Sequence, residues 1–345
     1  MTMNLASVAA YAAQFGVSGE DVLRIAVEEG LLRRAALVNG PFMLKGSYVT
    51  RQLLDEGWRR IPGDLDWVGL GQLDAAELTQ WLTAVTETEL DDGIRFRSFA
   101  ENAFWRMIDY AMDDDFPTVN TDLFAWVDEQ PCNIPGMDVS FGLKLQPPPR
   151  PLSYIPQFGD AFVLPTTCPL ELQLAWKLHQ CLLRPRFKDM LDLILLLREN
   201  VVDTESTWRA LEDECRHDGT PISRFDSLLD GTIGEHPHWQ RLQKSSLSAA
   251  DYFSIWRSGD GAGYWAEPAM SRVYIDGDGI AAAFGDFLAE LAYQLKRAGF
   301  ARTAPGAPSS QVELVEPKST APQPVGKSVP GGITGLLRRW IARRS

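Results

Sequence analysis

Two short segments in the first fifth of the chain carry residues suited to phosphate and metal chemistry. Gly46-Ser47 follows an apolar run at 42–44, and Asp64-Leu65-Asp66 follows the turn Pro62-Gly63. A glycine at the start of a helix lets the backbone approach a ligand closely, and the N–H groups of the first helical turn attract phosphate oxygens. Two neighbouring carboxylates repel each other, and a divalent cation between them relieves that repulsion. The two segments together favour a site that holds a nucleotide's phosphates beside a divalent metal.

The elements that would position these groups follow from the hydrophobic pattern. Residues 42–44 predict a short buried strand, and residues 48–58 predict a helix that starts near Ser47. If Asp64 and Asp66 lie on the next strand, they point to one face, because strand side chains alternate with a period of two.

A third carboxylate lies in the segment 136–142. Apolar residues alternate there with small or polar ones between two glycines, which predicts another short strand. Asp138 joins Asp64 and Asp66 if this strand pairs beside theirs; otherwise it is a solvent-exposed residue at a strand end.

Two helices are predicted farther along the chain. The stretch 171–184 has the pattern of an amphipathic helix, a proline ends it, and a second helix begins near Lys188. Lys177 is a candidate for a phosphate contact, although many lysines on apolar helices only extend to water. Asp189 and Asp192 lie one turn apart and share a face of the second helix.

Five short motifs therefore follow one another along the chain. They are Phe-Met-Leu-Lys-Gly-Ser at 42–47, Arg-Ile-Pro-Gly-Asp-Leu-Asp-Trp at 60–67, Met-Asp-Val-Ser-Phe-Gly at 137–142, Ala-Trp-Lys-Leu at 175–178 and Lys-Asp-Met-Leu-Asp-Leu at 188–193. In this order they resemble the AbiEii/AbiGii nucleotidyltransferase toxins, which belong to the DNA polymerase β-like nucleotidyltransferase superfamily. The resemblance covers roughly residues 20 to 200.

The resemblance implies a fold, a cofactor and a set of site residues. The fold is α+β, with a polymerase β-like nucleotidyltransferase domain that contains a mixed sheet, followed by a helical domain. The enzyme is a nucleotidyltransferase that uses Mg²⁺ or Mn²⁺ and takes an NTP as its substrate. The implied catalytic residues are Asp64, Asp66, Asp138, Lys177 and Asp189, of which the first three hold the metal. The implied nucleotide-binding residues are Lys45, Gly46, Ser47, Arg60 and Lys177.

The resemblance also implies a biological role. Members of the family are bacterial toxins, commonly encoded beside an antitoxin or in phage-defence loci, and characterised relatives transfer nucleotides to RNA, including tRNA acceptor ends. We therefore expect an RNA acceptor, with the tRNA 3′ end favoured, a cognate antitoxin, and a role in growth inhibition or phage defence. Two alternatives stay open: nucleotidylation of a protein target, and a catalytically silent module that binds a partner.

The chain departs from the family's usual motifs at two places. Lys45-Gly46-Ser47 stands where members usually have Lys-Gly-Gly, but Gly-Ser is the form found in the wider superfamily. Pro62 replaces the threonine of the usual Arg-x-Thr-x-Asp-Leu-Asp, which removes one hydrogen bond near the site and bears on substrate choice.

The charge of the chain bears on the acceptor. The net charge is −13, which is unfavourable for a broad RNA-binding surface because phosphate binding draws on lysine and arginine. Either a local patch holds the RNA, or the acceptor is not RNA. From residue 301 onward seven Lys or Arg residues stand against two Glu residues, so the rest of the chain carries the acidic excess.

Composition divides the chain into five parts. We predict N-terminal helices at 1–35, a catalytic domain at 36–165, a C-terminal helical domain at 166–300, a disordered linker at 301–331 and a basic amphipathic helix at 332–345. The last part is expected to contact RNA, a partner protein or a membrane surface, or to be a frayed tail. No apolar run is long enough to span a membrane and the opening residues lack a basic n-region, which predicts a cytoplasmic protein.

Overall fold

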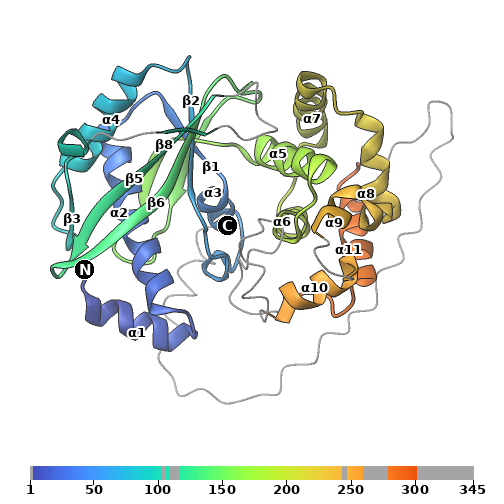
Figure 1. The fold of residues 1–345 in the computed structure, drawn as a ribbon, viewed down its shortest axis with the longest axis horizontal. Coiled ribbons are helices and arrows are strands. Elements are labelled where there is room, and N and C mark those ends of the chain that lie inside the picture. The colour runs from blue at the N-terminus through green and yellow to red at the C-terminus, as the bar shows by residue number, and fades with distance from the viewer. Residues whose placement is uncertain (1–2, 103–105, 109–116, 243–246, 259–278, 301–345) are drawn as a thin grey trace.

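A mixed sheet of eight strands forms the first half of the structure, and a group of helices forms the second half (Figure 1). The structure is a computed structural model that describes residues 3–102, 106–108, 117–242, 247–258 and 279–300. The strands are β1 (Phe42–Lys45), β2 (Leu65–Gly69), β3 (Ile94–Phe96), β4 (Arg106–Ile108), β5 (Thr118–Val127), β6 (Gln130–Ser140), β7 (Arg150–Tyr154) and β8 (Phe162–Thr167). The α-helices are α1 (Leu5–Phe15), α2 (Gly19–Val38), α3 (Ser47–Gln52), α4 (Ala75–Glu87), α5 (Leu170–Leu183), α6 (Phe187–Glu199), α7 (Thr204–Asp218), α8 (Asp226–Asp230), α9 (Pro237–Leu242), α10 (Ala249–Ser258) and α11 (Phe284–Arg297). The linker and basic helix predicted at 301–345 lie outside the described residues.

The sheet topology places the strands of the predicted site in the middle of the sheet. The strand order is β3-β5-β6-β2-β1-β8-β7, with β4 paired to β5. β1 runs antiparallel to β2, β2 runs parallel to β6, and β5 and β6 form an antiparallel pair. The prediction of an α+β fold with a mixed sheet is therefore confirmed, as is the pairing of the Asp138 strand beside the Asp66 strand.

The strand boundaries differ slightly from the predicted ones. β2 begins at Leu65, so Asp64 precedes the strand and Asp66 lies within it. β6 is longer than the predicted segment 136–142 because it also pairs with β5 toward its N-terminal end.

The helix predicted over 47–58 was too long. α3 ends at Gln52, the chain turns, and a short 3₁₀ helix follows at Gly57–Arg59. The reason is a close approach between Gly57 and Arg51, since a Cβ on Gly57 would lie 1.7 Å from the Arg51 carbonyl oxygen. The Arg51 Nε donates a hydrogen bond to the Gly57 carbonyl oxygen at 3.2 Å, which fixes this reversal of the chain.

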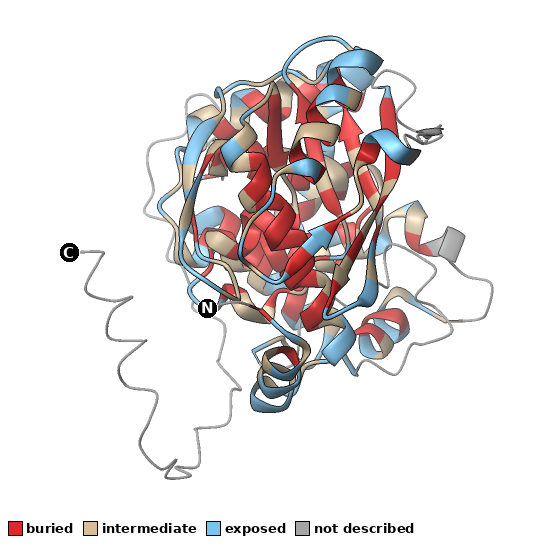
Figure 2. Ribbon diagram, turned by 90° about the vertical axis from the view of Figure 1, so that its left-hand side faces the viewer, coloured by how far each residue is buried: buried red, intermediate tan, exposed pale blue. Residues whose placement is uncertain are grey.

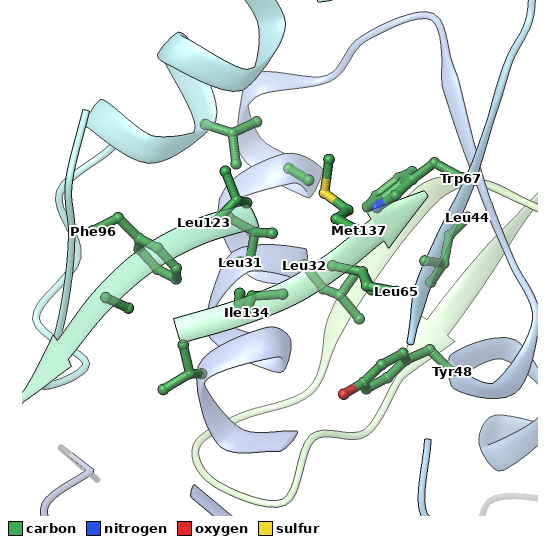
Figure 3. Packing of buried hydrophobic residues seen from close by; sticks show 14 of the residues in the cluster. Leu31, Leu32, Leu44, Tyr48, Leu65, Trp67, Phe96, Leu123, Ile134 and Met137 are labelled. Atoms are coloured by element: carbon green, nitrogen blue, oxygen red, sulfur yellow. The ribbon is translucent and has the colours of Figure 1, made fainter. Parts of the chain in front are cut away.

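The sheet and α2 share one hydrophobic core. Leu31 and Leu32 of α2 pack among Leu65, Ile134 and Met137 of the strands (Figure 3). α2 continues to Val38, so the boundary predicted after residue 35 falls within this helix. The N-terminal helices are thus built into the core beneath the sheet.

The second core lies among the helices that follow the sheet. The two helices predicted around residue 185 are confirmed as α5 and α6. Phe187 at the start of α6 stacks on Trp239, with ring centroids 4.6 Å apart, and both rings are buried. Met43 of β1 and Val68 of β2 also belong to this core, so it extends from the helices onto the sheet. Buried residues fill the interior of the strands and of the helices beside them (Figure 2).

Among the described residues, no helix combines the length and apolar character needed to cross a membrane.

Candidate active site

Four polar side chains form a row across the middle of the sheet. In the strand pairing Lys45 of β1 is opposite Asp66 of β2, Asp66 is opposite Asp138 of β6, and Asp138 is opposite Asn120 of β5. Residues directly opposite each other in a sheet lie on the same face with their Cβ atoms close together. Segments from distant parts of the sequence thus bring one cation, two carboxylates and one amide side by side.

Gly46 lies against the Asp66 carboxylate. Its backbone has φ = +75°, which strongly favours glycine, and a Cβ at this position would lie 2.3 Å from Asp66 Oδ2. A side chain here would push the carboxylate away. The glycine predicted to approach a ligand therefore also makes room for the central carboxylate of the row.

Ser47 and Gln173 complete this corner of the site. The Ser47 hydroxyl is buried and forms no hydrogen bond with the described part of the chain. Gln173 of α5 holds the turn, because its Nε2 donates to the Gly46 carbonyl oxygen at 2.7 Å and its Oε1 accepts from the Gly46 N–H at 3.3 Å. Sequence reasoning missed Gln173, and its signal was a buried amide within an otherwise apolar helix face.

The Asp66 carboxylate carries unneutralised negative charge. Partial burial raises its pKa to about 6, and the charges of Asp64 and Asp138 act in the same direction. Lys45 and Lys188 oppose this rise, and the Lys45 ammonium lies 3.9 Å from Asp66 Oδ1. The net effect is still a raised pKa, which indicates that the row has more carboxylate than cation.

Asn120 orients the third carboxylate. Its Nδ2 donates a hydrogen bond to Asp138 Oδ1 at 2.6 Å. Asn120 was not predicted, because the sequence does not state which residue of β5 faces Asp138.

Three further predicted residues, Arg60, Lys177 and Asp189, form a network of ion pairs with two residues that were not predicted as part of the site, Asp192 and Arg186. Lys177 donates to Asp192 at 2.6 Å and to Asp189 at 3.5 Å. Arg60 donates to Asp192 at 2.8 Å, and Arg186 pairs with Asp189. Four of these residues are buried, and Arg186 is partly exposed.

In this network the pKa values of the aspartates are lowered, whereas the pKa of Asp66 is raised. Burial raises the pKa of Asp192, but Arg60 and Lys177 outweigh burial and hold that pKa well below its usual value. Burial also raises the pKa of Asp189, but the charges of Arg186 and Lys177 outweigh burial, so this pKa is lowered as well. These carboxylates are held charged by cations of the protein itself.

Lys188 interacts electrostatically with both groups of carboxylates. Burial and the charge of Arg186 lower its pKa, while Asp189 and Asp64 raise it. Lys188 also stabilises the charged form of Asp66. Sequence reasoning used Lys188 only as a helix start, although its place beside Asp189 was visible in the motif.

The oxygen ligands present suit a hard divalent cation. No group of three or more His, Cys, Asp and Glu side chains in the described ranges is close enough to form a complete metal site. Mg²⁺ is usually held by one or two carboxylates together with water and substrate phosphates, and Asp66 and Asp138 supply two such carboxylates.

The chain is similar to the nucleotidyltransferase toxin MenT4 of Mycobacterium tuberculosis H37Rv, at 14% identity and a TM-score of 0.47, over 86% of this chain and 89% of that one. It is also similar to a nucleotidyltransferase, described as putative, from H. pylori, at 12% identity and a TM-score of 0.39, over 82% of this chain and 96% of that one. No curated protein sequence matches it significantly.

A family model gives the assignment. The model for the nucleotidyl transferase AbiEii toxin of type IV toxin–antitoxin systems matches residues 33–259, a range that includes all of the predicted site residues. The chain therefore belongs to the AbiEii family of nucleotidyltransferase toxins, and it is a nucleotidyltransferase.

Proposed function

We propose that the protein transfers a nucleotide from an NTP to the 3′ end of an RNA, with tRNA favoured, in a reaction that depends on Mg²⁺ or Mn²⁺. The observation that supports this best is the row of Lys45, Asp66 and Asp138 across β1, β2 and β6, with Gly46 packed against Asp66. Such a row offers a cation for phosphates and carboxylates for a metal on one face of the sheet.

Asp66 and Asp138 are the residues that would hold the metal, with Asp64 beside them. The raised pKa of Asp66 supports this assignment, because its causes are burial of the carboxylate and the charges of Asp64 and Asp138, and a bound cation would offset both. When bound, the metal supplies charge neutralisation for the phosphate groups.

The side chains of the protein have separate roles in the proposed transfer. Lys45 and the Ser47 hydroxyl bind phosphate oxygens of the NTP. Asp138, oriented by Asn120, accepts the proton of the acceptor hydroxyl as its oxygen bonds to the α-phosphorus and the bond to pyrophosphate breaks.

The buried ion pairs of Arg60 and Lys177 with Asp192 hold the segments that carry the site residues in place. Arg60 precedes β2 and pairs with Asp192, so it fixes the segment that leads to Asp64 and Asp66. A contact between Lys177 and the triphosphate requires its ammonium to leave Asp192, and we assign that role to the nucleotide-bound state.

Labelled nucleotides test the proposal directly. Purified protein is incubated with each radiolabelled NTP, total bacterial RNA and Mg²⁺, alongside Asp66→Asn. The exposed Asp286 at the start of α11 provides a matched control, Asp286→Asn. We expect label in RNA with the intact protein and with the control, and a loss of at least about 100-fold with Asp66→Asn. Label in RNA that persists in Asp66→Asn would overturn the assignment of the site.

A protein acceptor is the second candidate. The net charge of −13 favours it, since an acidic surface repels RNA but not most proteins. Label that enters a protein band and not RNA in the same assay identifies this activity, and label in neither identifies a silent binding module.

The role in the cell is proposed on the same basis. We propose a cytoplasmic toxin that is neutralised by a cognate antitoxin and acts in growth control or phage defence. Induced expression of the intact chain in a bacterial host should stop growth, and expression of Asp66→Asn should not. If the intact chain and Asp66→Asn stop growth equally, toxicity does not depend on nucleotide transfer.

A further inference from the structure

Trp176 of α5 stands next to the row of charged side chains and has no role in the transfer described so far. The side chain is partly buried and packs against the core of the helical half. Its indole Nε1 donates a hydrogen bond to Glu214 Oε1 on α7 at 3.0 Å. One edge of the ring is therefore anchored, which fixes the orientation of its faces.

Lys45 connects the Trp176 ring to the carboxylates. The Lys45 ammonium lies 6.0 Å from the ring centroid and 3.9 Å from Asp66 Oδ1. A cation at this distance from an aromatic ring is attracted to its face. The Trp176 ring therefore lies one side chain away from the position proposed for the phosphates.

The segment that follows β6 brings further groups to the neighbourhood of Trp176. Lys144, a few residues after Asp138, pairs with Asp213 of α7 at 2.5 Å. Asp213 precedes Glu214, the anchor of the indole, in the same helix. Leu143 and Leu145 pack against the same core as Trp176. Trp176, in the middle of α5, thus lies near helix α7 and the segment that follows the catalytic strand β6.

We propose that the nucleobase of the NTP stacks on Trp176 while its phosphates lie at Lys45 and Ser47. This inference rests on the proposed function and names the residue that recognises the base. An indole face accepts any base, because every base has a π-face, so Trp176 provides affinity for nucleosides without selecting one of the four. The anchoring by Glu214 keeps the ring in place before the nucleotide arrives, which reduces the entropy lost on binding.

The test compares two ligands that share phosphates and differ in the base. Binding of ATP and of inorganic triphosphate to the full-length protein is measured by calorimetry in the presence of Mg²⁺. The variants are Trp176→Leu, which removes the aromatic face, and Trp176→Phe, which keeps one. Trp208→Leu is the matched control, because Trp208 also donates to a glutamate, at 2.8 Å to Glu212, and also packs partly buried against this core.

We expect Trp176→Leu to weaken ATP binding by about tenfold or more and to leave triphosphate binding unchanged. Trp176→Phe should weaken ATP binding by less, and Trp208→Leu should affect neither ligand. In the transfer assay Trp176→Leu should raise the KM for the NTP with little change in kcat.

The outcomes that contradict the inference are distinct from failure of the proposed function. Equal losses for ATP and triphosphate would mean that Trp176 acts only by supporting Lys45, and unchanged ATP affinity would mean that the base lies elsewhere. If the intact protein binds neither ligand, the proposed function itself fails, and this inference fails with it.

Discussion

Two groups of aspartates lie near each other in this protein, and their electrostatic states are opposite. On the sheet, Asp66 beside Asp64 and Asp138 has a pKa raised to about 6. Between α5 and α6, Asp189 and Asp192 have pKa values below the usual range. The sheet group has too few cations, whereas the helix group is neutralised by buried cations.

The contrast separates binding from support. A buried carboxylate that is fully paired helps to hold the geometry of the folded state. Removing one partner of such a pair is strongly destabilising, because the other charge is left buried without a partner. Carboxylates left with excess charge destabilise the free protein and are stabilised when a cation binds, which is typical of functional sites. Of these two groups, the one with unfavourable electrostatics is therefore the one on the sheet, where a ligand is expected.

The largest expected effect on stability comes from breaking the helix group. Asp192→Ala leaves the guanidinium of Arg60 and the ammonium of Lys177 buried without their shared partner. We expect the free energy of unfolding to fall by roughly 3–5 kcal/mol, as measured by urea denaturation.

A surface ion pair provides the control for this substitution. Asp213 pairs with Arg216 at 2.6 Å and with Lys144 at 2.5 Å, but the two partner side chains are 70% and 60% exposed. Asp213→Ala should therefore lower the free energy of unfolding by less than about 1 kcal/mol. Similar losses for Asp192→Ala and Asp213→Ala would show that the helix group is not a buried support.

Neutralising a carboxylate of the sheet group should raise the free energy of unfolding instead of lowering it. The pKa of Asp66 is raised from an ordinary value of 3.8 to about 6 in the folded protein, so folding favours its protonated form. Its contribution to stability is present below the lower value and is lost as the pH rises toward 6. In metal-free protein at pH 8, Asp66→Asn should therefore be more stable than wild type by roughly 3 kcal/mol.

The pH dependence distinguishes this effect from a change in packing. The stability difference between Asp66→Asn and wild type should grow between pH 4 and pH 6 and stay constant above pH 7. Addition of Mg²⁺ should stabilise wild type more than the variant. A difference that does not vary with pH would contradict the assignment of excess charge to Asp66.

A smaller loss of stability is expected from Gly46→Ala. The substitution places a Cβ against Asp66 Oδ2 in a backbone conformation with positive φ, and we expect it to lower the free energy of unfolding by about 1–2 kcal/mol. Nucleotide transfer should be nearly abolished even though the protein still folds, because the new Cβ displaces the Asp66 carboxylate. Gly71→Ala is the control, since a Cβ on Gly71 meets nothing within 4 Å and its φ is not positive.

The sequence alone predicted the sheet group better than the helix group. Gly46, Asp66 and Asp138 were identifiable because glycine before a helix and carboxylates on strands each have a local signature, and the structure places them together. Lys177 and Arg60 were predicted as nucleotide ligands, but their pairing with Asp192 depends on how α5 and α6 pack. Periodicity shows which face of a helix is apolar, not which charges on two helices will meet.

Partners that depend on strand register were out of reach for the same reason. Asn120 meets Asp138 only because β5 and β6 pair in one register, and a shift by one residue would turn Asn120 to the other face. The early end of α3 likewise depends on the contact between Gly57 and Arg51, which local propensity does not encode.

Lys188 gives the finest test of the comparison, because it interacts with both groups. Its charge lowers the pKa of Asp66 and also that of Asp189. Lys188→Met should raise the pKa of Asp66 by about half a unit, or roughly 0.7 kcal/mol, because it removes one of the two cations that oppose the rise and leaves Lys45 alone. Asp189 keeps Arg186 and Lys177, so its pKa should stay low. In the wild-type background, the stability difference caused by Asp66→Asn changes with pH around a midpoint near 6. In the Lys188→Met background, the same difference should have its midpoint at a higher pH. A midpoint that does not move would assign Lys188 to the helix group alone and would leave Lys45 as the cation that matters at Asp66.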